Sequence, residues 1–184
     1  MSGQAPGNAG TDSTYKGALP ALHLIVACTK VGRVIGHGLK MPWHYPEDFR
    51  YFKNTTRGHA VIMGRRSWDS LEKRTLPARP NLVVTRHAAG LTAGDMTGAQ
   101  VFSDLDAAIA AAFTLGEPPP FIIGGAQIYA AAMHRVTRMY ITEIQAEYPG
   151  DIVFPAFRAD EWRVVSRRSS ADAALEFLIY DRIS

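Results

Sequence analysis

The stretch LHLIVAC (22–28) decides the fold class, because it is a short apolar run bounded by residues of a different pattern. A run of this length and composition is typical of a strand that is buried on both faces. Similar runs recur at AVIM (60–63), NLVVT (81–85) and PFIIG (120–124). Strands of this kind belong to sheets that helices cover on both sides. We therefore expect an α/β protein with a mostly parallel sheet.

Three segments between and after these strands have the pattern of helices. YPEDFRYFKNTT (45–56) opens with a proline and two acidic residues, which favour a helix N-terminus. SDLDAAIAAAF (103–113) starts with a Ser-x-x-Asp capping signal and repeats apolar residues at helical spacing, and AQIYAAAMH (126–134) is the third helix. The last part of the chain alternates in polarity, as antiparallel strands do, in three segments: 138–148, 161–169 and 174–183.

The composition fits one globular domain with a terminal extension. The chain has 184 residues, of which 47% are hydrophobic. Residues 1–20 are rich in Gly, Ser, Thr, Ala and Pro, so we expect a disordered extension followed by a domain over 21–184. No apolar run approaches the ~20 residues of a membrane span, and the N-terminus lacks a secretory signal. We predict a cytoplasmic protein without membrane association.

Charge and cysteine content argue against several classes of site. The net charge is only +3, and no run of five or more basic residues occurs, so we do not expect nucleic-acid binding. The single cysteine, Cys28, excludes an intramolecular disulfide and a multi-cysteine zinc site, and the scattered histidines predict no metal site. From its place in the first strand, Cys28 is interpreted as a small hydrophobe.

A carboxylate and an aromatic residue share one face of the helix expected over 45–56. Asp48 and Phe52 are four residues apart, whereas Glu47 is turned roughly 100° away from Asp48. A carboxylate on an inward face costs free energy unless it accepts hydrogen bonds, so a polar ligand would account for Asp48. On spacing alone, two acids that only stabilise the helix N-terminus remain the alternative.

Two strand-to-helix turns carry glycine, VIMGRRSW (61–68) and FIIGGAQIY (121–129). Glycine allows a sharp turn and lets backbone N–H groups approach a phosphate. Arg65 and Arg66 follow the first turn, and Arg86 follows the next strand, a supply of arginine that matches a dinucleotide with an additional 2′-phosphate. Plain tight turns remain the alternative, since neither turn is the six-residue dinucleotide-binding fingerprint.

Arg79 lies between two prolines in LPARPNLVV (76–84), just before a predicted strand. The prolines fix the local backbone, and a guanidinium held there could bind a carboxylate through two parallel hydrogen bonds. An ordinary surface arginine is the alternative interpretation. Zinc-ligand spacings, a nucleophile elbow and a phosphate-binding Walker loop do not occur in the sequence.

These motifs together resemble the dihydrofolate reductase family of the bacterial chromosomal type. The resemblance covers roughly residues 22–183 and rests on motifs that recur in one order: the apolar strand, GRVIGHGLKMPWHYPEDFRYFKNTT, VIMGRRSW, LPARPN, FIIGGAQIY, YITEI and GDIVFP. It implies the family's fold, a mostly parallel eight-stranded central sheet with an antiparallel C-terminal hairpin and about four flanking helices.

The resemblance also implies a reaction, the NADPH-dependent reduction of 7,8-dihydrofolate to 5,6,7,8-tetrahydrofolate in one-carbon metabolism. Hydride moves to pterin C6 and a proton to N5, which ordered water is expected to carry. The resemblance implies four catalytic candidates. By position, Asp48 is the carboxylate at the pterin edge, and Thr142 is its hydrogen-bond partner. Trp43 belongs to a mobile loop over the nicotinamide, and Tyr129 lies at the edge of the nicotinamide. Antifolate inhibitors and a monomeric state are implied as well.

The resemblance implies two sets of binding residues. Arg79 would bind the α-carboxylate of the glutamate tail, and Arg65 and Arg86 the 2′-phosphate of NADPH. The substrate set is Val26, Ala27, Cys28, Asp48, Phe49, Phe52, Leu71, Leu76, Arg79, Ile123 and Thr142. The cofactor set is Ala27, Ile35, Gly64, Arg65, Arg66, Ser67, Thr85, Arg86, Ile123, Gly124, Gly125, Ala126, Gln127, Ile128 and Tyr129.

Two other functions remain as alternatives. The first is the reductase of riboflavin synthesis, which shares the fold and acts on a ribosylamino-pyrimidine, but lacks a carboxylate placed like Asp48. The second is a non-catalytic nucleotide-binding module with a basic face for RNA, whose binding would be sensitive to salt. Oxidation of NADPH on addition of dihydrofolate distinguishes the expected activity from the RNA-binding module, and the Asp48→Asn substitution tests the role of that carboxylate.

Overall fold

The computed structural model describes residues 20–72, 74–87, 96–115 and 118–183. All but the last residue of the extension expected over 1–20 therefore lies outside the described residues. No helix within the described ranges combines the length and the apolar character that crossing a membrane requires.

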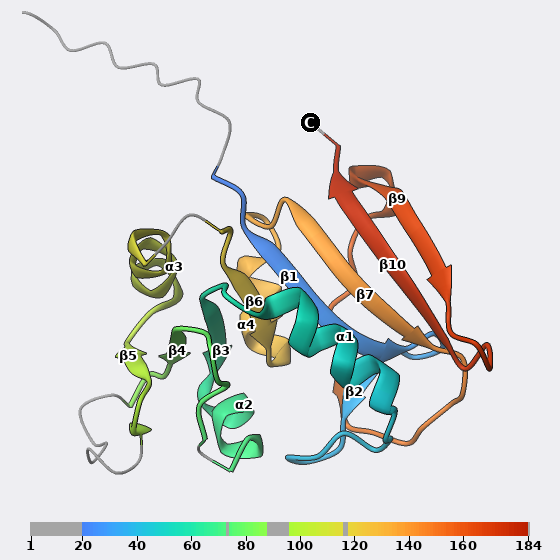
Figure 1. Ribbon diagram of the computed structural model, residues 1–184, viewed down its shortest axis with the longest axis horizontal. Helices are drawn as coiled ribbons and strands as arrows, with labels where there is room; N and C mark the ends of the chain where they lie inside the picture. Colours follow the sequence, from blue (N-terminus) through green and yellow to red (C-terminus); the bar gives the residue numbers. More distant parts are fainter. Residues whose placement is uncertain (1–19, 73, 88–95, 116–117, 184) are drawn as a thin grey trace, which may run out of the picture.

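An eight-stranded sheet forms the centre of the molecule, in the strand order β5-β4-β3-β6-β1-β7-β10-β9 (Figure 1). The strands from β5 to β7 run parallel to one another, β10 runs antiparallel to β7, and β9 antiparallel to β10. Their bounds are β1 (His23–Thr29), β3 (Val61–Gly64), β4 (Asn81–Val84), β5 (Gln100–Phe102), β6 (Phe121–Gly124), β7 (Arg138–Ile144), β9 (Trp162–Ser169) and β10 (Leu175–Arg182).

Helices cover both faces of this sheet. α1 (Pro46–Thr56) and α2 (Arg65–Ser70) pack on one face, and α3 (Leu105–Thr114) and α4 (Ala126–Ala132) pack on the other. Alternation along β1 sends Leu24 into the core beneath α3 and α4 and Ile25 into the core beneath α1 and α2. Both faces of the strand are therefore buried, as its continuous apolar sequence predicts.

A second, two-stranded sheet lies beside the carboxyl ends of the parallel strands. It pairs β2 (Val34–Gly36) with β8 (Ile152–Val153). The segment 37–45 that follows β2 is tied to the region before β8: the Gly38 amide donates to Asp151 Oδ1 at 2.9 Å, and the Tyr45 and Tyr148 hydroxyls are hydrogen-bonded at 3.0 Å. We call residues 37–45 the entrance loop.

The expected fold class is confirmed, with three local differences. β7 was expected to pair as an antiparallel strand, but it runs parallel to β1 and is antiparallel only to β10. α3 is capped by Asp104, whose side chain accepts from the Ala107 amide at 2.8 Å, so that Ser103 is not the cap. The strands β2, β5 and β8 have only two or three residues, too few for a period to be detected.

Candidate active site

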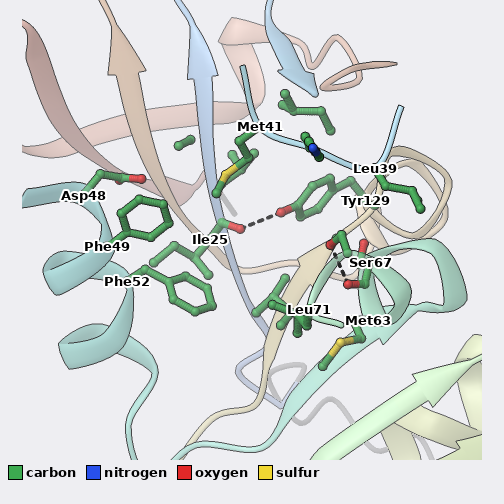
Figure 2. A pocket seen from close by; sticks show the side chains of 18 of the residues that line it. Ile25, Leu39, Met41, Asp48, Phe49, Phe52, Met63, Ser67, Leu71 and Tyr129 are labelled. Carbon is green, nitrogen blue, oxygen red and sulfur yellow. Dashed lines mark hydrogen bonds between the residues drawn. The ribbon is translucent and has the colours of Figure 1, made fainter. Parts of the chain in front are cut away.

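A cavity of about 580 Å³ opens at the carboxyl ends of β1, β3 and β6. Open α/β sheets bind ligands at this edge, where neighbouring connections leave in opposite directions. Figure 2 shows Asp48, Phe49 and Phe52 of α1 on one side of the cavity and Ser67, Leu71 and Tyr129 on the other. The entrance loop contributes Leu39, Lys40, Met41 and Trp43 to the wall.

Asp48 is the buried carboxylate of this cavity, with 8% of its surface exposed. It lies in the first turn of α1, which forms because Pro46 occupies the first helical position and acidic residues favour the N-terminal end of the helix dipole. Burial raises the pKa of Asp48 above its ordinary value, and a hydrogen bond from the Thr142 side chain on β7 only partly opposes this. The cavity wall therefore carries an acidic group whose charge is destabilised by burial and only partly stabilised by Thr142.

Apolar side chains form the wall that continues from Asp48 along α1. Phe52 lies one turn after Asp48, and Leu71 and Leu76 follow α2. The backbone of Leu76 is fixed by the Asn81 side chain, which accepts from the Leu76 amide at 2.9 Å and donates to its carbonyl at 3.0 Å. The result is a slot suited to a flat, mostly apolar group.

Arg79 lies at the far end of this slot. Its Nη1 donates to Thr56 Oγ1 at 2.7 Å, its Nε donates to the Pro77 carbonyl at 3.0 Å, and its guanidinium carbon is 6.0 Å from the Phe52 ring centroid. Burial and the neighbouring Arg57 lower its pKa. Across the described ranges, no carboxylate forms an ion pair with Arg79, so this end of the slot is suited to an anion.

The two glycine turns approach each other on the opposite side. A Cβ on Gly124, whose φ is +134°, would lie 3.1 Å from Ser67 Oγ, and one on Gly125 would lie 3.3 Å from the same atom. The Gly124–Gly125 peptide bond is cis. The Tyr129 hydroxyl donates to the Ile25 carbonyl at 2.8 Å, joining α4 to β1 beneath the cavity. A side chain at either glycine would press against Ser67, so only bare backbone fits between the two turns at this part of the cavity wall.

The predicted phosphate-binding arginines lie at the same edge of the sheet. Gly64 and Val84 are paired in β3 and β4, and Arg65 and Arg86 follow within two residues of these positions. Arg65 Nε donates to Asp69 Oδ1 at 2.9 Å, one turn further along α2. The structure therefore brings both side chains to neighbouring strand ends, outside the wall of the cavity itself.

The predicted site residues divide into two groups. Those that line the cavity are Val26, Ala27, Ile35, Trp43, Asp48, Phe49, Phe52, Ser67, Leu71, Leu76, Ile123, Gly124, Gly125 and Tyr129. Those outside its wall are Cys28, Gly64, Arg65, Arg66, Arg79, Thr85, Arg86, Ala126, Gln127, Ile128 and Thr142. Cys28 is separated from the cavity because it packs in the core beneath α3 and α4, where burial raises the pKa of its thiol to about 12.

Several lining residues were not predicted as site residues. These are Ile25, Leu39, Lys40, Met41, Met63 and Ser70. Met63 precedes Gly64 at the end of a buried strand, a position that could have been noticed, whereas the loop residues carry no periodic signal. Among the residues that the structure describes, no group of three or more His, Cys, Asp or Glu side chains could hold a metal ion.

Comparisons with known proteins agree with this geometry. The family model described as dihydrofolate reductase matches residues 21–182. The chain is 42% identical over 163 residues to the dihydrofolate reductase of Neisseria meningitidis serogroup A, covering 86% of this chain and 96% of that protein. It is 36% identical over 155 residues to the Bacillus subtilis enzyme, covering 82% and 88%.

A solved structure is similar over nearly its whole length. Dihydrofolate reductase from Enterococcus faecalis, complexed with NADP(H) and RAB-propyl, superimposes with a TM-score of 0.79 and 25% sequence identity, covering 89% of this chain and 97% of that chain. The family match spans every element that forms the cavity, from β1 to β10. The chain therefore belongs to the dihydrofolate reductase family.

Proposed function

We propose that this chain reduces 7,8-dihydrofolate to 5,6,7,8-tetrahydrofolate with NADPH as the reductant. The observation that carries the proposal is the Asp48 carboxylate, which is buried at the cavity wall and accepts a hydrogen bond from the Thr142 side chain. A pterin offers two adjacent donors, the N3–H and the 2-amino group, that match the two oxygens of one carboxylate. Binding of that edge compensates the charge that burial destabilises.

The residues present fit NADPH. Gly124 and Gly125 put bare backbone beside Ser67 at the cavity wall, where a phosphate-bearing ligand can approach the main chain, and Arg65 and Arg86 supply cations at the neighbouring strand ends. These arginines would hold the 2′-phosphate, and Ala27, Ile35, Ile123 and Tyr129 would lie beside the nicotinamide. The cofactor, when bound, supplies the hydride.

The chain contributes orientation, charge and exclusion of water. Asp48 fixes the pterin edge, and its negative charge stabilises the electron-poor ring that gains a hydride at C6 and a proton at N5. We assign the N5 proton to water, because Asp48 binds a different edge of the pterin ring. Trp43, which is 7% exposed, and the rest of the entrance loop shield the reacting atoms from bulk solvent.

The remaining parts of the substrate have matching surfaces. The slot formed by Phe49, Phe52, Leu71 and Leu76 suits the p-aminobenzoyl ring, and Arg79 at its end suits the α-carboxylate of the glutamate. The same surfaces are expected to bind diaminopyrimidine antifolates, whose amino groups resemble the pterin edge. Such a compound should compete with dihydrofolate.

The loss of NADPH absorbance on adding dihydrofolate tests the proposal. We expect turnover that a diaminopyrimidine suppresses, and we expect Asp48→Asn to lower kcat/KM by roughly 10²-fold or more at neutral pH. Absence of NADPH oxidation by the wild-type protein, or unchanged turnover in the variant, would refute the proposal. Salt-sensitive binding of RNA without oxidation would instead support the nucleotide-binding alternative.

A further inference from the structure

A line of paired residues crosses the sheet beneath the first turns of α1. Thr142 on β7 is paired with Phe177 on β10, and Phe177 is paired with Arg168 on β9. Directly paired residues in neighbouring strands project from the same face of a sheet. The three side chains therefore form one row on the face that carries α1.

The outer end of this row is connected to α1 at two points. Arg168 Nη1 donates to Glu47 Oε1 at 2.8 Å, and the guanidinium carbon lies 4.1 Å from the Phe177 ring centroid. The Phe177 ring in turn packs against Tyr51, with ring centroids 4.6 Å apart. Glu47 and Tyr51 are one helical turn apart, so these contacts fix both the position and the rotation of the start of α1.

The inner end of the row reaches the neighbouring residue of the same helix. Thr142 hydrogen-bonds to Asp48, which directly follows Glu47. These contacts and strand pairings therefore connect Glu47, through Arg168, Phe177 and Thr142, to Asp48, the next residue of the same helix. We infer that Arg168 and Glu47 are a positioning pair, which holds the first turn of α1 on the sheet and thereby keeps Asp48 against Thr142.

The inference rests on the proposed function and adds to it a residue on the edge strand, outside the cavity wall. The side chains of Arg168 and Glu47 are 53% and 35% exposed, so the expected effect is that of a partly screened ion pair, about two- to fivefold in kcat/KM. A matched control is available on the same strand. Arg167 Nη1 donates to Glu176 Oε1, also at 2.8 Å, but adjacent strand residues point to opposite faces, so this pair faces away from α1.

A double-mutant cycle with Glu47→Gln and Arg168→Gln tests the inference. We expect each single variant to lower kcat/KM for dihydrofolate about two- to fivefold, and the double variant to lose no more than one single variant. Arg168→Lys should recover part of the loss, because an ammonium can still pair with Glu47. Arg167→Gln should lower only the thermal unfolding temperature and leave kcat/KM at the wild-type value.

A second measurement is independent of turnover. The pKa of Asp48, followed by carbon-13 NMR, should rise in Arg168→Gln as the Thr142 hydrogen bond weakens, and should not rise further when Arg168→Gln is added to Thr142→Val. Three outcomes would each overturn the inference. The first is that Arg168→Gln keeps the wild-type kcat/KM and Asp48 pKa, and the second is that the losses of kcat/KM in the double-mutant cycle are additive. The third is that Arg167→Gln loses as much kcat/KM as Arg168→Gln. Failure of the wild-type protein to oxidise NADPH would refute the proposed function, while the NMR titration would still decide the positioning role.

Discussion

The Asp48 carboxylate is buried at the cavity wall, although a charged carboxylate is more stable in water. Because burial raises its pKa in the folded protein, the folded state binds a proton more readily than the unfolded chain does. Its contribution therefore favours folding at low pH and opposes folding once the group ionises.

Asp48→Asn should consequently make the protein more stable while it removes activity. An amide of nearly the same shape carries no charge, so we expect a higher free energy of unfolding than wild type at pH 8. The difference should shrink as the pH falls through the raised pKa of Asp48 in the folded protein, and should vanish below the lower pKa that Asp has in the unfolded chain, where both proteins are neutral at this position. Urea unfolding at pH 8 and at pH 3 measures the two values. A variant that is less stable than wild type at pH 8 would contradict this account.

The spacing of residues in the sequence can identify a site residue such as Asp48, but it cannot identify all the residues that line the cavity around it. Asp48 and Phe52 lie on one helix face, and their four-residue separation is visible in the sequence. Ser70 lines the same cavity for a different reason, namely that α2 lies against the end of β6. Such contacts depend on how elements pack, which local periodicity does not encode.

At the scale of elements, the small β2–β8 sheet controls the position of the entrance loop. Gly150 precedes β8 at a point where a Cβ would lie 2.3 Å from Val34 Cγ1 and 2.5 Å from the Gly36 carbonyl oxygen. Any side chain there must displace β2, and with it the bond from the Gly38 amide to Asp151.

Gly150→Ala should therefore affect both stability and turnover. We expect a loss of about 1–3 kcal/mol in the free energy of unfolding, as for other overpacked sites, and a fall of at least about tenfold in kcat/KM because the loop no longer shields the cavity. Denaturant unfolding and steady-state kinetics measure these effects. Val153→Ala, an exposed change on β8 itself, serves as the control and should leave both values near wild type.

The elements that were predicted are those whose patterns extend over several residues. β1, β3, β4 and β6 coincide with the apolar runs to within a residue or so, and α1 with its proline and acidic start. The two short strands of the entrance region are fixed instead by pairing partners more than a hundred residues away. Only the resemblance to a known family implied the eight-stranded sheet; periodicity could not supply the strand number or order.

At the scale of the whole molecule, His23 makes folding sensitive to acid at the end of β1 remote from the cavity. Its ring lies 5.1 Å from the Phe121 ring and 5.7 Å from the Tyr140 ring, and its Nδ1 is buried without a partner in the described part of the chain. Burial, followed by the charges of Arg138 and His59, lowers the pKa of His23 to about 4, and Asp181 partly opposes this shift.

Stability should therefore fall on acidification between about pH 6.5 and pH 4. In this interval the unfolded chain binds a proton at His23 that the folded protein does not, so the free energy of unfolding decreases as the pH decreases. His23→Gln should flatten this part of the profile, whereas His87→Gln, at an exposed position, should leave it unchanged. Equal slopes for wild type and His23→Gln would exclude His23 as the cause.

The two edges of the sheet favour a monomer. β5 at one edge has only three residues, and β9 at the other exposes Arg163, Arg167 and Arg168 along its length, which discourages pairing with a second sheet. We expect a mass near 20.1 kDa by light scattering at all concentrations tested. A mass that rises with concentration would show that one of these edges associates. A cytoplasmic location and the lack of nucleic-acid binding stay predictions.

The place of β6 between β3 and β1 has a consequence for synthesis of the chain. Among the described residues β1 pairs with β6 and β7 alone, so it has no partner in the sheet until residues 121–124 have emerged from the ribosome. A nascent chain that stops before Phe121 holds the β5-β4-β3 fragment, whose β3 edge is open, and an unpaired β1. Premature termination products should therefore be removed by proteases or aggregate, and the cavity can form only after about two thirds of the polypeptide has been made.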